Sequence, residues 1–137
     1  MIQKIVIDTG PLIAYLNPKD THHAWAIEAL SSLNLPLLSC EAVIAEAYFL
    51  LRRDHLGSDA LMRLLEEEII QISFSLKNEI PAIRELMRRY RSVPMSLADA
   101  CLVRISELNQ DVKILTLDSD FLIYRRDRNA IIPVIMP

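Results

Sequence analysis

The chain has 137 residues, 52% of them hydrophobic and only two of them glycine, which fits one compact domain spanning residues 1–137 and argues against disorder and internal repeats. The formal net charge of −3 lacks the basic excess typical of nucleic-acid-binding proteins. No stretch approaches the roughly 18 uncharged apolar residues that a membrane span requires, so no membrane partner is expected.

The two cysteines and the N-terminal residues indicate the compartment. Cys40 and Cys101 lie far apart in sequence and outside the spacing of zinc or CxxC sites, so we expect buried thiols in a reducing cytoplasm. Asp8 and Pro11 interrupt the first apolar stretch, so no secretory signal is predicted. The expected localisation is therefore cytoplasmic.

The first predicted element is a strand at residues 5–7, where three branched aliphatic residues follow one another without alternation. Such a run is typical of a strand covered on both faces in a parallel sheet. Gly10 and Pro11 mark the turn that leaves it. Asp8 then lies at the carboxyl end of a buried strand, where open α/β sheets bind their ligands, although an aspartate there is also an ordinary helix cap.

Helices predominate in the middle of the sequence. Apolar residues at helical spacing predict amphipathic helices over residues 20–34, 41–55 and 76–90. We expect Ser39 to cap the second of these, and Gly57 to mark a break before another helix that ends near residue 68. Short extended or β-branched segments predict strands at residues 35–38 and 69–72.

The last part of the sequence continues the alternation of helices and strands. Ser96 is expected to cap a helix that ends at Leu108. A strand over residues 113–116, a short helix over 118–124 and a last strand over 131–135 follow. Strands that alternate with helices imply right-handed crossovers, so the predicted fold class is α/β, a three-layer α/β/α sandwich with a mainly parallel central sheet.

Acidic residues fall at positions that this layout directs to one edge of the sheet. They are Asp8, Glu46, Asp99, Asp118 and Asp120. The aspartates follow predicted strands or lie in the first turn of a helix, and Glu46 lies about 40° from Leu50, at the margin of an apolar stripe. Each one also has a structural explanation as a helix cap, a rim ion pair with Arg52 or Arg53, or part of a Ser-x-x-Asp capping box.

Together these carboxylates suggest a metal site. Several carboxylates within a few ångströms are strongly unfavourable unless protons or cations compensate, and oxygen ligands favour Mg²⁺ or Mn²⁺. Such a site suits phosphodiester hydrolysis in which an ion lowers the pKa of a bound water and neutralises charge on the leaving oxygen. Thr9 and Thr116 are candidate hydrogen-bond partners of the carboxylates, with turn formation as the alternative. If the five carboxylates form such a site, the rest of the molecule carries a net charge of +2, so the distribution of charge matters more than its sum.

Four segments carry these residues in a recognisable order: "VIDTGPLIAYL", "AVIAEAYFLL", "SLADACLV" and "ILTLDSDF". In them the chain resembles, over nearly its whole length, the PIN domain family, and within it small proteins similar to VapC-type toxins. The resemblance implies an endoribonuclease that cuts single-stranded or looped RNA with Mg²⁺ or Mn²⁺. Gly10 stands where the family often has serine, which removes a hydroxyl but no proposed ligand.

The resemblance also implies residue roles and partners. Asp8, Glu46, Asp99 and Asp118 match the family's catalytic metal-site positions, with Asp120 as a supporting acid among the ligands. Such proteins commonly form homodimers, and toxin members are neutralised by an antitoxin protein that covers the site. Two alternatives stay open: a non-catalytic PIN-like module that binds RNA or protein, and a metal-dependent phosphatase.

Arginine clusters offer cationic partners for RNA phosphates. They are the pair at residues 52–53, Arg88-Arg89 with Arg91, and Arg125-Arg126 with Arg128. The first and third follow acidic motifs and have the stronger functional case. All of them have an ordinary explanation as a solvated face or a helix C-terminal charge, so none is assigned as an RNA contact.

Overall fold

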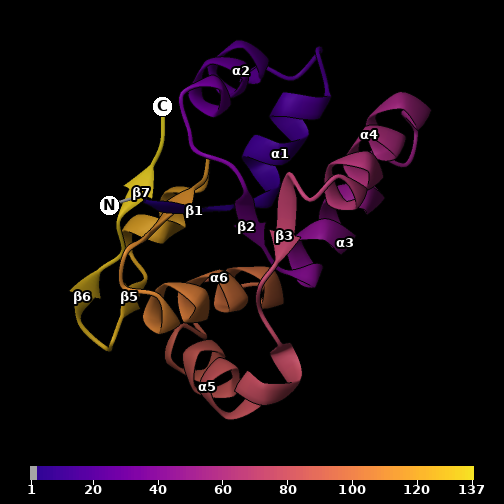
Figure 1. The fold of residues 1–137 in the computed structure, drawn as a ribbon. Helices are drawn as coiled ribbons and strands as arrows, with labels where there is room; N and C mark the ends of the chain where they lie inside the picture. The colour runs from indigo at the N-terminus through magenta and orange to yellow at the C-terminus, as the bar shows by residue number, and fades with distance from the viewer. Residues whose placement is uncertain (1–2) are drawn as a thin grey trace.

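A parallel β-sheet crosses the middle of the protein, with helices on both sides of it (Figure 1). The computed structural model describes residues 3–137. The strands of the sheet are β1 (Lys4–Ile7), β2 (Leu37–Ser39), β3 (Ile70–Ile72), β4 (Val112–Leu115) and β7 (Val134–Ile135). They lie in the order β3-β2-β1-β4-β7, and every neighbouring pair is parallel. The predicted three-layer α/β/α fold is confirmed.

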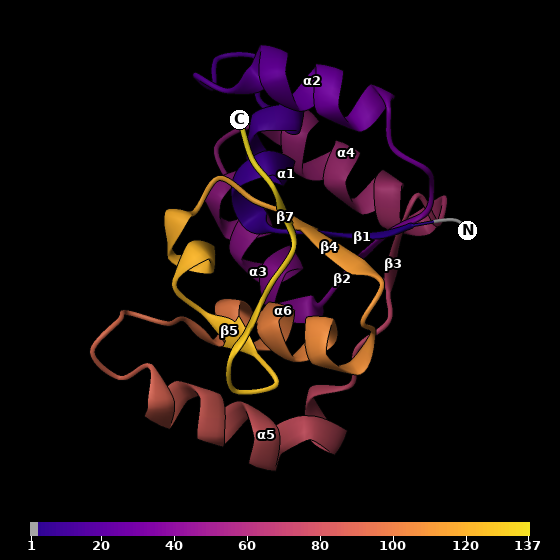
Figure 2. The ribbon, with the colours of Figure 1, turned by 90° about the vertical axis from the view of Figure 1, so that its left-hand side faces the viewer.

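Helices form the two outer layers. They are α1 (Thr9–Leu16), α2 (His23–Ser31), α3 (Glu41–Leu50), α4 (His55–Glu66), α5 (Leu76–Arg89) and α6 (Leu97–Leu108). Figures 1 and 2 show α1, α2 and α4 on one side of the sheet and α5 and α6 on the other. A 3-10 turn, η1 (Ser119–Leu122), follows β4, and β5 (Arg125–Arg126) pairs with β6 (Ala130–Ile131) as an antiparallel hairpin.

The core lies where the central strands meet α6. Ile5, Val6 and Ile7 of β1 are at most 2% exposed, as their unbroken apolar run predicts for a strand covered on both faces. Complete burial of such a side chain stabilises the fold by about 1.5–3 kcal/mol. Cys40 and Cys101 are both buried free thiols, as expected. Within residues 3–137 no helix combines the length and hydrophobicity that crossing a membrane would need.

Two predicted helix signals, the Ser39 cap and the Gly57 break, are wrong because other residues begin these helices, whereas the predicted start at residue 41 is confirmed. Ser39 is the last residue of β2, and its hydroxyl donates a hydrogen bond of 3.2 Å to the Ile7 carbonyl, so α3 begins after Cys40. Gly57 does not break a helix. The Asp54 carboxylate accepts hydrogen bonds of 3.1 Å from the backbone N–H groups of residues 56 and 57, which starts α4 early and places Gly57 in its first turn.

The predicted turn at Gly10 and Pro11 is instead the first turn of α1. Proline is tolerated there because the first backbone N–H groups of a helix have no partner within it. The predicted last strand is also divided, since β6 ends at Ile131 and β7 begins at Val134, with a buried Ile132 between them. The short helix predicted after β4 is the 3-10 turn η1.

Candidate active site

A cavity of about 360 Å³ opens where the carboxyl ends of β1 and β4 meet α3 and the start of α6. Its lining includes four of the five acidic residues that the sequence singles out: Asp8, Glu46, Asp99 and Asp118. Asp120 is not among the lining residues. Four side chains that are distant in sequence are thus gathered at one edge of the sheet, because parallel strands present their carboxyl ends on the same side.

Asp8 is the most buried of these acids, at 7% exposed. It caps α1, and its Oδ1 accepts a hydrogen bond of 2.7 Å from the Thr9 backbone N–H. Its pKa is raised to about 6, chiefly because burial disfavours the charged form, and the negative charges of Asp99 and Asp118 raise it further, whereas hydrogen bonds from Thr116 and Thr9 lower it. The ionised carboxylate therefore lacks a compensating positive charge.

The Thr116 hydroxyl joins two of the acidic segments. It is fully buried, donates a hydrogen bond of 2.7 Å to Asp8 Oδ2, and accepts one of 2.9 Å from the Asp118 backbone N–H. Asp118 caps η1 through its Oδ1, which accepts a hydrogen bond of 2.9 Å from the Asp120 backbone N–H. Thr116 thus fixes the position of Asp8 relative to the segment that carries Asp118.

Asp99 both caps its helix and lines the cavity. The predicted capping box is present: the Ser96 hydroxyl accepts a 3.0 Å hydrogen bond from the Asp99 backbone N–H, and Asp99 Oδ2 accepts one of 3.1 Å from the Ser96 N–H. The hydroxyl of the fully buried Tyr124 donates to the same Oδ2 at 3.4 Å. Burial is the main cause that raises the Asp99 pKa. The structural role of Asp99 therefore does not exclude a functional one.

Glu46 reaches the cavity from the exposed side of α3. Val43 and Ala47 are the fully buried residues of that helix, whereas Leu50, which belongs to the apolar stripe of the sequence, is 54% exposed. Leu50 lines the same cavity as Glu46. Glu46, which the sequence places at the margin of the apolar stripe of this helix, therefore lies in the wall of the cavity.

Three residues near the cavity were not predicted from the sequence. Asp20 and His22 belong to its lining, and the Asp20 Oδ1 accepts a 2.8 Å hydrogen bond from the His22 backbone N–H. The helix predicted over residues 20–34 is shorter, because α2 begins only at His23, and His22 precedes it. Tyr124 was missed as a partner of Asp99. Hydrophobic periodicity gives no signal for these residues, because it does not report how a loop folds over a distant helix.

The donor chemistry of the cavity fits a hard divalent cation. Its carboxylates provide oxygen ligands. Thr9 Oγ1 is buried beside Asp8 and forms no hydrogen bond with any residue from 3 to 137. Within the same range, no three side chains of His, Cys, Asp or Glu converge closely enough to hold an ion as they stand. The carboxylates thus line a cavity that could hold an ion only after small side-chain movements. The Thr9 hydroxyl is a polar group in its lining without a hydrogen-bond partner among residues 3–137.

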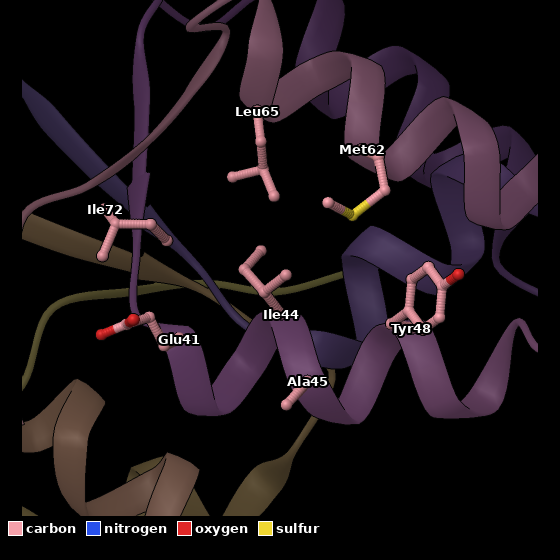
Figure 3. A pocket seen from close by; sticks show the side chains of 7 residues that line it. All are labelled: Glu41, Ile44, Ala45, Tyr48, Met62, Leu65 and Ile72. Atoms are coloured by element: carbon pink, nitrogen blue, oxygen red, sulfur yellow. The ribbon is translucent and has the colours of Figure 1, made fainter.

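A larger hollow lies between α3 and α4 but has different chemistry. It has a volume of about 550 Å³, and Figure 3 shows Ile44, Met62 and Leu65 pointing into it, with Tyr48 at one end. Glu41 is the acidic residue of its lining. One carboxylate beside an apolar wall does not provide a metal site, so the smaller acidic cavity is the better candidate for catalysis.

Known proteins similar to this chain agree in family and fold. A family model of the PIN domain matches residues 5–127. Ribonuclease VapC26 of Mycobacterium tuberculosis is 28% identical over 134 residues, which cover 95% of this chain and 93% of that protein.

Two solved structures also match. VapC20 of Mycobacterium tuberculosis, a sarcin-ricin loop cleaving toxin, superposes with a TM-score of 0.77 at 18% identity, covering 85% of this chain and 92% of the other. FitAcB from Neisseria gonorrhoeae gives a TM-score of 0.56 at 17% identity, over 84% of this chain and 88% of the other. At these identities the matches establish a shared fold.

Proposed function

The chain belongs to the PIN domain family, and we propose that it is a metal-dependent endoribonuclease that hydrolyses phosphodiester bonds of RNA. The observation that carries the proposal is the convergence of Asp8, Glu46, Asp99 and Asp118 on one cavity. These residues come from four separate segments, and each segment belongs to a motif by which the sequence resembles the family. A role in folding alone does not require them to share one cavity.

In this proposal the four lining carboxylates hold Mg²⁺ or Mn²⁺ and form the catalytic site. When bound, such an ion lowers the pKa of a water molecule and neutralises charge on the phosphate. Asp120 is assigned a supporting role, because it does not line the cavity and its backbone N–H donates to Asp118 Oδ1.

Neighbouring hydrogen-bond donors orient two of these acids. Thr116 Oγ1 holds Asp8 Oδ2, while the Ser96 N–H and the Tyr124 hydroxyl hold Asp99 Oδ2. Each hydrogen bond fixes one carboxylate oxygen, so the side chain needs little reorganisation on binding a ligand. The buried Thr9 hydroxyl is a further polar contact for a water or substrate oxygen in the cavity.

The names of the relatives suggest the biological setting. VapC26 is named a ribonuclease and VapC20 a toxin that cleaves the sarcin-ricin loop. We extend this to the present chain as the toxin of a toxin-antitoxin pair that acts on RNA in the cytoplasm as a homodimer. An antitoxin protein that covers the acidic cavity would neutralise it.

The proposal is tested by incubating RNA with the purified protein in Mg²⁺, Mn²⁺ or EDTA, and by comparing the wild type with Asp8→Asn and Asp99→Asn. Asparagine caps a helix as well as the aspartate at position 8, and at position 99 its side-chain oxygen still accepts a hydrogen bond, so both variants should fold. We expect cleavage in Mg²⁺ or Mn²⁺ only, and a loss of at least about 100-fold in each variant. Circular dichroism checks that the variants are folded.

Each other result has a definite meaning. Cleavage that survives EDTA would contradict metal dependence. Turnover of a small phosphomonoester with intact RNA would indicate a phosphatase. Binding of RNA by wild type and variants alike, without cleavage, would indicate a non-catalytic binding module.

A further inference from the structure

A group of arginines surrounds the C-terminal end of α5. Arg88, Arg89, Arg91 and Ser92 line a shallow hollow of about 390 Å³. Arg128, from the hairpin between β5 and β6, lies near enough to contribute, with Arg88 and Arg89, to the lowered pKa of Glu85. We call Arg88, Arg89, Arg91 and Arg128 the α5 arginine cluster.

The α5 arginine cluster has a large excess of positive charge. Glu85 pairs with Arg88 at 2.6 Å and with Arg89 at 3.9 Å. Arg91 and Arg128 are exposed and form no hydrogen bond or ion pair with any residue from 3 to 137. The cluster thus has four guanidinium groups, and only two of them pair with a carboxylate, that of Glu85, on a protein whose overall net charge is −3.

The arginines that the sequence favoured for RNA are engaged elsewhere. The Arg52 guanidinium donates to the Phe49 carbonyl at 2.8 Å and stacks on the Phe49 ring at 3.9 Å. Arg125 Nη1 donates to three carbonyls at the end of η1, and Arg126 Nη1 to the Ser106 carbonyl. These contacts give structural roles to three of the four residues in the favoured pairs.

The α5 arginine cluster lies at the same end of the molecule as the acidic cavity. Figure 2 shows the C-terminal end of α5, the loop that follows it and the N-terminal end of α6 together on one side. That end of α6 carries Asp99. The Tyr90 ring lies 5.1 Å from the Tyr124 ring, whose hydroxyl donates to Asp99. Two packed tyrosines therefore connect the base of the cluster with the wall of the cavity.

We propose that the α5 arginine cluster binds phosphates of the RNA strand on one side of the cleaved bond; this rests on the proposed function. A cavity lined by carboxylates repels a polyanion, so a cationic surface beside it is needed to keep the strand in place. Arginine suits this task because its guanidinium binds phosphate through two parallel hydrogen bonds. Compensation of the α5 dipole accounts for Arg88 and Arg89, but not for Arg91 beyond the helix end or Arg128 in the hairpin.

The test measures RNA binding separately from cleavage. In an Asp8→Asn background, the affinity for a labelled single-stranded RNA is followed by fluorescence anisotropy between about 50 and about 200 mM salt. Arg88→Gln and Arg91→Gln are compared, singly and together, with Arg63→Gln, which removes one charge from an exposed arginine of α4. Each phosphate contact of a single strand contributes about 0.7 to the slope of log affinity against log salt concentration.

We expect the double variant to lower that slope by about 1.4 and to weaken binding at low salt by about tenfold or more, while Arg63→Gln leaves the slope unchanged. An equal slope in the double variant and Arg63→Gln would overturn the inference. So would a lower melting temperature with normal RNA affinity, since that result assigns the arginines to stability. Loss of binding to polyglutamate with RNA affinity unchanged would point to an acidic protein and overturn it too.

A parallel cleavage assay in the unmutated background separates this inference from the proposed function. If the wild type cleaves RNA and the Arg88→Gln/Arg91→Gln variant cleaves it with an unchanged KM, the α5 arginine cluster has no role in binding and the proposed function stands. If the wild type neither binds nor cleaves RNA, both proposals fail.

Discussion

Replacement of Asp8 by asparagine should stabilise the metal-free protein at neutral pH. The substitution keeps the size of the side chain and its ability to cap α1, and removes the charge that burial disfavours. The pKa of Asp8 rises from 3.8 to about 6 on folding. At about 1.4 kcal/mol per pH unit, this difference corresponds to about 3 kcal/mol of free energy of unfolding.

The sign of the effect follows from where the proton binds. Between about pH 4 and pH 6 the folded protein binds a proton at Asp8 that the unfolded chain does not. The contribution of Asp8 to stability is therefore fully present below about pH 4 and is lost as the pH rises through about 6. Asp8→Asn lacks this dependence, so its advantage over the wild type should grow with pH and reach about 2–3 kcal/mol above about pH 7.

Urea unfolding followed by circular dichroism in EDTA, at about pH 4, 6 and 7.5, measures the difference. Mn²⁺ at about 1,000 times its dissociation constant should then reverse the order of stability at the highest pH, because it stabilises the wild type by about 4.1 kcal/mol, which exceeds the gap. A variant that is less stable than the wild type in EDTA at about pH 7.5, or a gap that is the same at every pH, would refute the electrostatic account of Asp8.

Substitutions at four further positions test other parts of the site. Thr116→Val should lower the free energy of unfolding, measured in urea, by about 2–4 kcal/mol, because it removes one hydrogen bond to a buried carboxylate and one from a backbone N–H. Thr116→Ser keeps the hydroxyl and should retain most of the stability from both hydrogen bonds. Ser96→Ala should cost about 1 kcal/mol in the same assay by removing the capping box, and no loss would mean that the cap is dispensable. Asp120→Asn should reduce RNA cleavage only a few-fold and Asp118→Asn by about 100-fold or more, because only Asp118 lines the cavity; equal losses would give Asp120 a direct role.

Local sequence patterns were sufficient where a single element determines the outcome. The unbroken aliphatic run at residues 5–7 predicted a strand buried on both faces, and the aspartate after it lies at the carboxyl end of that strand. Ser96 and Asp99 predicted a capping box within four residues of chain. In these cases the interactions that decide the structure are close in sequence, so pattern and propensity are informative.

The missed features depend on contacts between distant segments. Asp20 and His22 reach the cavity because the loop before α2 folds beside α1, and Tyr124 meets Asp99 across 25 residues of sequence. Ser39 was wrongly assigned as a cap because its hydroxyl instead bonds to a neighbouring strand. Arg126 similarly donates to the Ser106 carbonyl, 20 residues away in sequence, which its sequence context did not reveal. Tertiary hydrogen bonds override local preference at each of these positions.

The acids of the cavity are also parts of helix ends, and this affects how the protein can evolve. Asp8 and Asp118 begin α1 and η1, and Asp99 belongs to the first turn of α6. Asparagine begins helices about as well as aspartate, so a single change of this kind alters charge while the architecture persists. Homologous proteins that lose catalytic activity should therefore acquire asparagine at these positions before they acquire apolar residues. Such proteins would be inactive but would still fold.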